Sequence, residues 1–239
     1  MFETTINAIS GAIIGAGISW ALEKWTSSFI SQFKKKDFNK SNSTLDKDAK
    51  NFSYWVYFFC LTIFISILAV WRQLSPELLN DLILVIALTG ISQIDLRTMY
   101  IDGRIIVFAL LLRLLWLIFF NPDEMLNYLA GLFFGAGLLY LIGFVYQTFR
   151  SYQGLGEGDA SVLGLIGMWI GWRELGTVVL IAALSGIFIG TSLLIAKDNK
   201  QTIGTLLKTQ IPFAPFLCFG GLVVYFLKES SYLKILNIF

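Results

Sequence analysis

The sequence predicts an all-α protein, a polytopic membrane helical bundle of about eight transmembrane helices. Of its 239 residues, 56% are hydrophobic and only 14% are charged, and the mean hydropathy is +0.71. Soluble domains are only about 45–50% apolar. A helix of about 20 apolar residues crosses the roughly 30 Å hydrocarbon core of a bilayer, and apolar runs of about this length recur along the chain. We therefore expect a lipid bilayer as a partner.

Eight apolar segments are expected to span the membrane, of which the third, fourth and sixth are short. The expected spans are 5–25, 53–71, 81–96, 105–120, 125–147, 158–172, 175–196 and 212–228. The start of the chain lacks the basic region and the cleavage site of a secretory signal, so we expect the first span to be retained. We interpret 1–239 as a single membrane domain, with N-terminal spans in 1–80 and a core in 81–228.

The basic residues are unevenly distributed between alternate loops. Twelve lie in one set of loops and four in the other, while Lys24 lies near the inner end of the first span and Arg113 lies inside the fourth. Cytoplasmic loops carry the excess of Lys and Arg. We therefore expect both termini outside and a cytoplasmic loop at 31–52, in which Lys34 to Asn51 lacks an apolar period and is predicted to be mobile.

Several classes of site are excluded by composition. The chain has no histidine, and its two cysteines, Cys60 and Cys218, lie far apart in apolar segments, where we expect them to pack. This excludes Ser–His and Cys–His catalysis and the usual zinc motifs, so no metal is expected. The net charge of +2 does not indicate nucleic acid, and the absence of a GK[ST] motif argues against nucleotide binding.

Two carboxylates stand out because they lie at the ends of spans. Asp95 closes the third span and Asp159 opens the sixth, so both are expected at the cytoplasmic end of their helices. Ionisable groups in membrane segments are functional by default. Two carboxyl groups about 3 Å apart share a proton. The ionised group can then activate a water molecule, while the other group donates its proton. Such a pair hydrolyses a peptide bond without histidine, metal or covalent nucleophile.

The residues around these aspartates resemble a known family. Gly156-Glu-Gly-Asp159, followed by Trp169-Ile-Gly-Trp172, is similar to the GxGD segment of bacterial type IV prepilin peptidases. Ile94 to Asp102 is similar to the first aspartate segment of that family, and Ile211-Pro-Phe-Ala-Pro215 to a segment before its last span. The resemblance covers about residues 83 to 226, in the right order.

The resemblance implies a membrane aspartic endopeptidase of the bacterial inner membrane, with 81–228 as the peptidase core. Its substrate would be a type IV prepilin or pseudopilin, whose short basic leader is removed after a glycine. Carried over by motif, the catalytic residues are Asp95 and Asp159, with the active site near the cytoplasmic face.

Four nearby residues receive lesser roles in binding substrate or shaping the loop. Gly156 and Gly158 permit backbone conformations closed to other residues and leave room for a substrate strand, although a flexible turn explains them too. Asp102 is expected to be a solvated cap or an ion-pair partner of Arg104 rather than a third catalyst. Glu157 is expected to point to water, with a lysine of the leader as its alternative partner.

The sequence departs from the family at three places. Ser161 stands where many members have lysine, and Ile101 stands where a proline is usual. The segment Lys34 to Asn51 has no cysteine, whereas bifunctional members carry paired CxxC motifs and a methyltransferase region there. We therefore expect peptidase activity and no cofactor, and S-adenosylmethionine is needed only if methyl transfer is retained.

Two other readings remain open. One is another GxGD intramembrane protease of the preflagellin or presenilin type, although no Pro-Ala-Leu segment is present. The other is a non-enzymatic ion transporter that binds its ion with Asp95 and Asp159, for which a position near the bilayer midplane would be expected. The identity of the pilin and the oligomeric state do not follow from the sequence.

Overall fold

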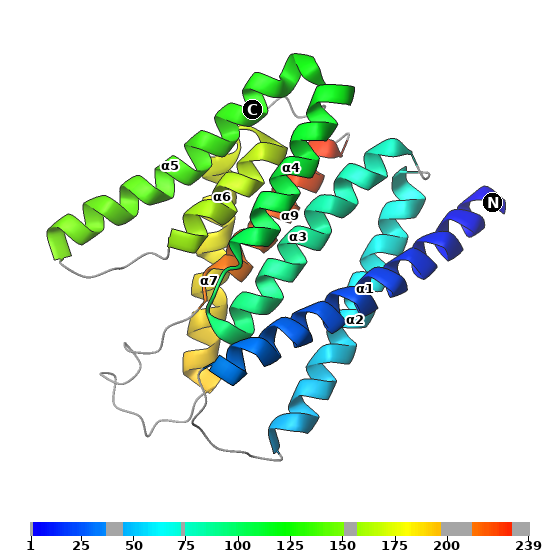
Figure 1. The fold of residues 1–239 in the computed structure, drawn as a ribbon, viewed down its shortest axis with the longest axis horizontal. Helices are drawn as coiled ribbons and strands as arrows, with labels where there is room; N and C mark the ends of the chain where they lie inside the picture. The colour runs from blue at the N-terminus through cyan, green and yellow to red at the C-terminus, as the bar shows by residue number, and fades with distance from the viewer. Residues whose placement is uncertain (1, 37–44, 73–74, 151–156, 197–211, 231–239) are drawn as a thin grey trace. The chain divides into compact units, whose positions relative to one another are not determined.

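The described residues of the chain fold into α-helices (Figure 1). The computed structural model describes residues 2–36, 45–72, 75–150, 157–196 and 212–230, and these contain no strand. The helices are α1 (Phe2–Lys36), α2 (Leu45–Arg72), α3 (Pro76–Thr98), α4 (Gly103–Phe120), the 3-10 helix η1 (Pro122–Glu124), α5 (Met125–Arg150), α6 (Glu157–Ile170), α7 (Leu175–Ala196) and α9 (Ala214–Glu229). The predicted all-α class is confirmed.

Every predicted span coincides with one of these helices. Five helical segments are long and apolar enough to cross a membrane: Thr4–Ser31, Pro76–Thr98, Gly103–Phe120, Pro122–Val145 and Leu175–Ser192. Two shorter apolar segments, Phe58–Arg72 and Gly158–Ile170, fall below that length. The chain is therefore a multi-pass membrane protein, and the number of eight spans stays a prediction.

Two predicted boundaries were wrong. The loop expected at 31–52 is shorter, because α1 continues to Lys36 and α2 begins at Leu45, while 37–44 lie outside the described residues. Lysine and glutamine are good helix formers, so a polar stretch without apolar period is compatible with a helix that continues out of the lipid. The third span is not short, because α3 has 23 residues and begins at Pro76, a position in which proline is favoured.

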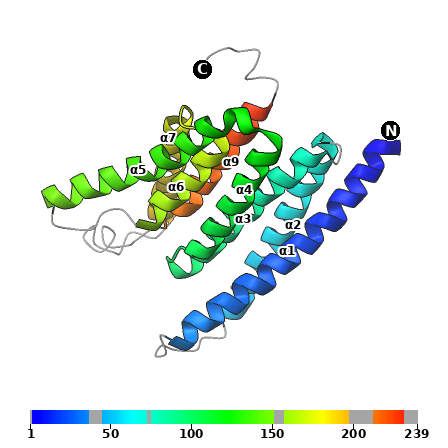
Figure 2. The same cartoon turned by 45° about the horizontal axis from the view of Figure 1, so that its top comes forward.

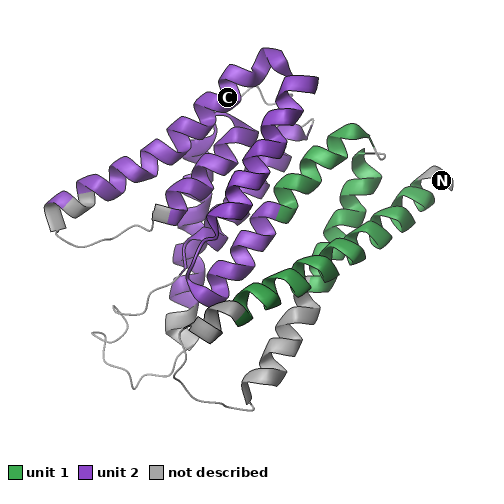
Figure 3. Cartoon of the chain, in the orientation of Figure 1, with its two compact units in different colours: residues 1–86 green, residues 87–239 purple. Residues whose placement is uncertain are grey.

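The chain divides into two compact units, Met1–Ile86 and Ala87–Phe239 (Figure 3). In the first unit, α1 packs on α2 through small residues: a Cβ added at Gly11 would lie 2.6 Å from the Cβ of Ala69. Such contacts let helices approach closely in lipid. At the corner between α2 and α3, the Nε of Arg72 lies 2.7 Å from the carboxylate of Asp81, which is fully buried.

The second unit is built around α6. Residues 162–170 of this helix are all buried, and α5, α6 and α9 lie side by side in two views (Figures 1 and 2). A Cβ added at Gly131 of α5 would collide with the carbonyl of Gly167, and one added at Gly221 of α9 would lie 2.8 Å from Ile166. The backbones of α5 and α6 are therefore in direct contact, and the backbone of α9 lies directly on the side chain of Ile166.

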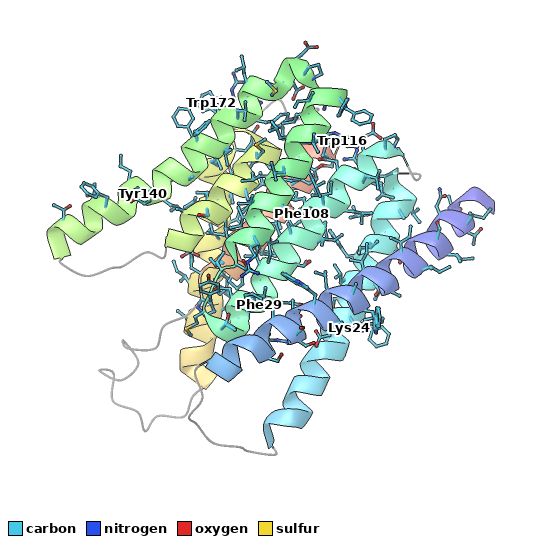
Figure 4. The ribbon with its side chains drawn as sticks, viewed as in Figure 1. Lys24, Phe29, Phe108, Trp116, Tyr140 and Trp172 are labelled. Atoms are coloured by element: carbon cyan, nitrogen blue, oxygen red, sulfur yellow. The ribbon has the colours of Figure 1, made fainter. Side chains whose placement is uncertain are left out.

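The outer faces of the second unit are apolar. Phe108 on α4 and Tyr140 on α5 project from the helices (Figure 4) and are 65% and 64% exposed. In water such a surface would be a liability, but in a bilayer it is the expected lipid-facing surface. The buried charged residues in the described part of this unit are Asp95, Asp102, Arg113 and Asp159.

Candidate active site

Asp95 lies in the last turn of α3 and is buried. Ile91 and Ile94 on the same helix have no exposed surface. The helix ends at Thr98, because Met99 adopts a left-handed backbone with φ of 52° while its N–H still bonds the Asp95 carbonyl at 2.8 Å. The chain thus turns away one helical turn after Asp95.

Asp159 is the third residue of α6 and is also buried, with 9% of its surface exposed. Helix N-termini carry a partial positive charge that favours a carboxylate. The preceding Gly158 lies against Ile101, since a Cβ added there would be 2.7 Å from the Cδ1 of that residue. The two aspartate motifs therefore touch each other at Gly158, which explains why this position needs a glycine.

The start of α9 completes the site. The backbone N–H of Ala214, the first residue of α9, approaches the carboxyl group of Asp95. One turn later, the thiol of Cys218 lies within electrostatic reach of both Asp95 and Asp159. The ends of α3, α6 and α9 therefore converge, with the two carboxyl groups beside the same face of α9.

One oxygen of this site has no hydrogen-bond partner. Asp95 Oδ2 is buried and unpartnered within the described residues. A buried polar atom left in this way is costly, by about 1–3 kcal/mol, and such atoms in native proteins are often reserved for catalysis or for water. The atom is therefore available to a water molecule or a substrate.

Asp102 acts as the N-cap of α4. Its Oδ1 accepts a hydrogen bond from the backbone N–H of Arg104 at 3.0 Å and lies 3.8 Å from the Arg104 Nε. The expectation of a solvated cap was wrong in one respect, because Asp102 is buried while the Arg104 side chain is 90% exposed. The cap fixes the turn that leads from Asp95 into α4.

The remaining predicted residues lie at the edge of what the structure describes. Gly156 lies outside the described residues, and Glu157 is the first residue of α6. Their roles in binding substrate or shaping the loop stay predictions. No group of three His, Cys, Asp or Glu side chains in the described parts of the chain is arranged to hold a metal ion.

A hollow of about 540 Å³ lies beside Asp102 on α4. It is lined by Tyr100, Asp102, Gly103, Arg104, Val107, Phe108 and Leu111. Its lining is mainly apolar and includes the exposed Arg104. The hollow begins five residues after Asp95, close to the site in sequence.

Sequence reasoning missed Ala214 and Cys218 as parts of this site. Ala214 contributes only its backbone N–H, which no pattern of side chains reveals, although the Pro212 and Pro215 that flank it do mark the start of a helix. Cys218 lies one turn further along the same face. Its position beside the aspartates depends on the packing of α9 against α6.

Comparison with known proteins identifies the same region. Residues 82–191 match the type IV leader peptidase family. A protein of Burkholderia pseudomallei (strain 1026b) described as "Prepilin leader peptidase/N-methyltransferase" is 31% identical over 151 residues, which cover 62% of this chain and 46% of that protein. Proteins with the same description from Legionella pneumophila and Aeromonas hydrophila are 30% and 27% identical, over 71% of this chain and 58% and 57% of their own.

The chain thus spans about half the length of the curated relatives it matches. No solved structure matches it. The matched region contains both Asp95 and Asp159, and it ends before α9.

Proposed function

Because residues 82–191 belong to the type IV leader peptidase family, we propose that this chain is a membrane aspartic endopeptidase. Its substrate is a type IV prepilin or pseudopilin, and the reaction removes the short leader. The observation that carries the proposal is that Asp95 and Asp159 are two buried carboxyl groups whose motifs are in contact at Gly158 and Ile101. Ionisable residues within membrane segments are functional by default.

The proposed reaction uses water as the nucleophile. One carboxylate of the pair accepts a proton as the water oxygen attacks the carbonyl carbon of the scissile peptide bond. The other carboxyl group, protonated at the start, gives its proton to the leaving nitrogen as the carbon–nitrogen bond breaks. The pair ends with the same single proton, so each turnover consumes one water and regenerates the site.

The surroundings of Asp95 suit this shared proton. The Ala214 N–H approaches the Asp95 carboxyl group, whereas Oδ2 has no hydrogen-bond partner within the described residues. That oxygen is available to the proton or the water. In the proposed pair, like-charge repulsion between the two carboxylates would keep one proton shared between them.

The location of the site supports peptidase chemistry over ion transport. Asp95 lies in the last turn of α3 and Asp159 in the first turn of α6, which are helix ends rather than midpoints. By the distribution of loop charge, this is the cytoplasmic side, where the basic leader of a prepilin would remain. A transporter would place its ion site near the bilayer midplane.

The proposal covers the peptidase step and leaves methyl transfer to experiment. The names of the relatives include N-methyltransferase, but residues 34–51 of this chain contain no cysteine. Mass spectrometry of the mature pilin N-terminus decides the matter. An unmethylated terminus on a cleaved pilin supports a peptidase without the second activity, and S-adenosylmethionine is required only if a methyl group is found.

The decisive experiment is coexpression with a candidate prepilin, with leader removal followed on a gel. We expect cleavage by the wild type and none by Asp95→Ala or Asp159→Ala. Asp123→Ala is the matched control, because this exposed aspartate lies in η1 and its loss should leave cleavage unchanged. Normal processing by either active-site variant would refute the proposal.

A further inference from the structure

At the C-terminal end of α6, opposite Asp159, two basic side chains bind backbone carbonyls: Arg113 of α4 and Lys228 of α9. The Arg113 Nε–H donates to the carbonyl of Met168 at 3.2 Å, and the Lys228 ammonium donates to the carbonyl of Ile170 at 2.7 Å. We refer to Arg113 and Lys228 as the C-terminal cation pair. Both donors reach carbonyls of the last turn of α6.

The length of α6 explains why these donors are needed. Its 14 residues give a length of about 21 Å, which cannot cross a hydrocarbon core of roughly 30 Å. The helix stops at Ile170, because Gly171 has φ of 84° and returns its N–H to Gly167 at 2.8 Å. The last carbonyls of a helix have no intrahelical partner, and in lipid they must find one in the protein.

The cation pair is itself held in place. Arg113 is 3% exposed, and its guanidinium lies 4.7 Å from the ring centre of Tyr128 and 5.2 Å from that of Trp169. The Lys228 ammonium lies 5.6 Å from the Tyr128 ring and 3.9 Å from the carboxylate of Glu174. Cation–π contacts of this kind attract the cation to the face of the ring, so both charges are held against the aromatic side chains.

The sides of α6 leave it little freedom. Gly131 of α5 lies in backbone contact with Gly167, and Leu132 of α5 contacts Gly164 one turn earlier. A short helix packed at backbone distance behaves as a rigid body, because close-packed interiors transmit displacement rather than absorb it. A shift at Ile170 is therefore carried along the helix to Asp159.

We infer that Arg113 and Lys228 are positioning residues that set the depth of Asp159 relative to Asp95. The inference rests on the proposed function for its catalytic meaning. The cation pair lies one helix length away from Asp159, about 17 Å along the axis for 11 residues, so it does not touch the reacting atoms. It acts by fixing the axial position of α6.

Steady-state kinetics on a prepilin substrate in detergent or nanodiscs test this inference. Arg113→Met and Lys228→Met should lower kcat about tenfold or more, since a displacement of 1 Å at a catalytic group costs up to about 10²-fold, while KM stays within about twofold. Lys228→Arg retains a donor for the Ile170 carbonyl and should restore most of kcat. Wild-type kcat in both methionine variants would overturn the inference.

The matched control is Arg173→Met. It removes an arginine near the same end of α6 that is exposed and lies over the Trp172 ring at 5.6 Å, and we expect wild-type kinetics. If Arg113→Met does not fold, Lys228→Met decides alone, because the Lys228 side chain is 32% exposed and its loss disturbs the core less. A loss of kcat in Arg173→Met equal to that in Lys228→Met would also overturn the inference.

A second measurement needs no activity and separates this inference from the proposed function. In a Cys60→Ser background, Ser161→Cys reports the depth of the first turn of α6 through its labelling rate with a water-soluble maleimide. We expect Lys228→Met to change this rate about threefold or more, by the same displacement argument, and to leave Thr191→Cys on α7 unchanged. If no prepilin is cleaved, the proposed function fails while this result stands; an unchanged rate at position 161 refutes the positioning role.

Discussion

The two ends of α6 are built in opposite ways. At the N-terminal end lie Asp159 and, beside the same Cys218 of α9, Asp95, one oxygen of which has no hydrogen-bond partner within the described residues. At the C-terminal end, Arg113 and Lys228 each donate to a carbonyl of the last turn. The first end holds a carboxyl oxygen with unused hydrogen-bonding capacity, and the second end holds basic groups that donate to helix carbonyls.

The two ends of α6 therefore have different roles: the N-terminal end carries a proposed catalytic residue, and the C-terminal end holds the helix in place. Unmade hydrogen bonds destabilise a fold, so a protein keeps them where a substrate or water will complete them. Completed bonds between charged donors and helix carbonyls stabilise it. We expect substitutions at the first end to reduce activity without reducing stability, and substitutions at the second end and its packing surface to reduce stability.

The largest effect is expected at the N-terminal end. Asp95→Asn and Asp159→Asn each remove a carboxyl group that the proposed reaction needs as acid or base, so the rate of leader cleavage should fall by about 10²–10⁴-fold. The thermal midpoint in detergent should stay equal or rise, because a group held for function is not optimised for stability. Cleavage rates on a gel and thermal scans of the same preparations measure the two quantities.

A parallel loss of activity and thermal midpoint in both asparagine variants would contradict this contrast. In that case the carboxyl groups would be structural, and the two ends of α6 would be alike.

The next effect concerns the surface that holds α6 against α5. A Cβ added at Gly131 would meet the backbone of Gly167, which cannot move aside, whereas one at Gly137 would meet nothing within 4 Å. Gly131→Ala should therefore destabilise the protein by at least about 1–3 kcal/mol, the usual cost of overpacking. Gly137→Ala should be neutral or slightly stabilising, because alanine is the better helix former. Thermal midpoints of the two variants, compared side by side, test this.

A smaller effect is expected at the cap next to the candidate site. Asp102→Ala removes the acceptor for the Arg104 N–H, and loss of an N-cap costs about 1 kcal/mol. We expect a modest drop in thermal midpoint and a partial loss of activity. Activity abolished as completely as in Asp159→Asn would mean that Asp102 takes part in the reaction itself.

The smallest effect is expected at the turn after α3. Met99 has φ of 52° and is 56% exposed. A left-handed backbone costs a residue with a side chain about 1–2 kcal/mol, and glycine removes that cost at an entropic penalty of roughly 0.5–1 kcal/mol. Met99→Gly should raise the thermal midpoint slightly with cleavage unchanged; a decrease would show that the Met99 side chain stabilises the turn.

Much of the fold followed from hydropathy alone. Each predicted span corresponds to a helix, because an apolar run in lipid has no other way to satisfy its backbone. The predicted start of the third span was late because Asn80 and Asp81 interrupt the apolar run, and Asp81 is neutralised by Arg72 across a corner. A partner of this kind is found only once the two helices are packed.

The candidate site was predictable in its side chains and not in its backbone. Asp95 and Asp159 stood out as acids at the ends of spans, and the contact of Gly158 with Ile101 now brings their motifs together. The Ala214 N–H was not predictable, because every residue except proline has one. Arg113 of the predicted fourth span is buried and donates to the carbonyl of Met168, an acceptor that no pattern of acidic side chains reveals.

The shortness of α6 also bears on how water reaches the candidate site. The helix has 14 residues, and Arg113 and Lys228 donate hydrogen bonds to carbonyls at its C-terminal end. The proposed reaction therefore needs solvent only at the N-terminal end of the helix. Water therefore has to enter from one face of the bilayer to a shallow depth, and no aqueous path through the membrane is required. The permeability barrier to ions can then remain intact while a peptide bond is hydrolysed beside it.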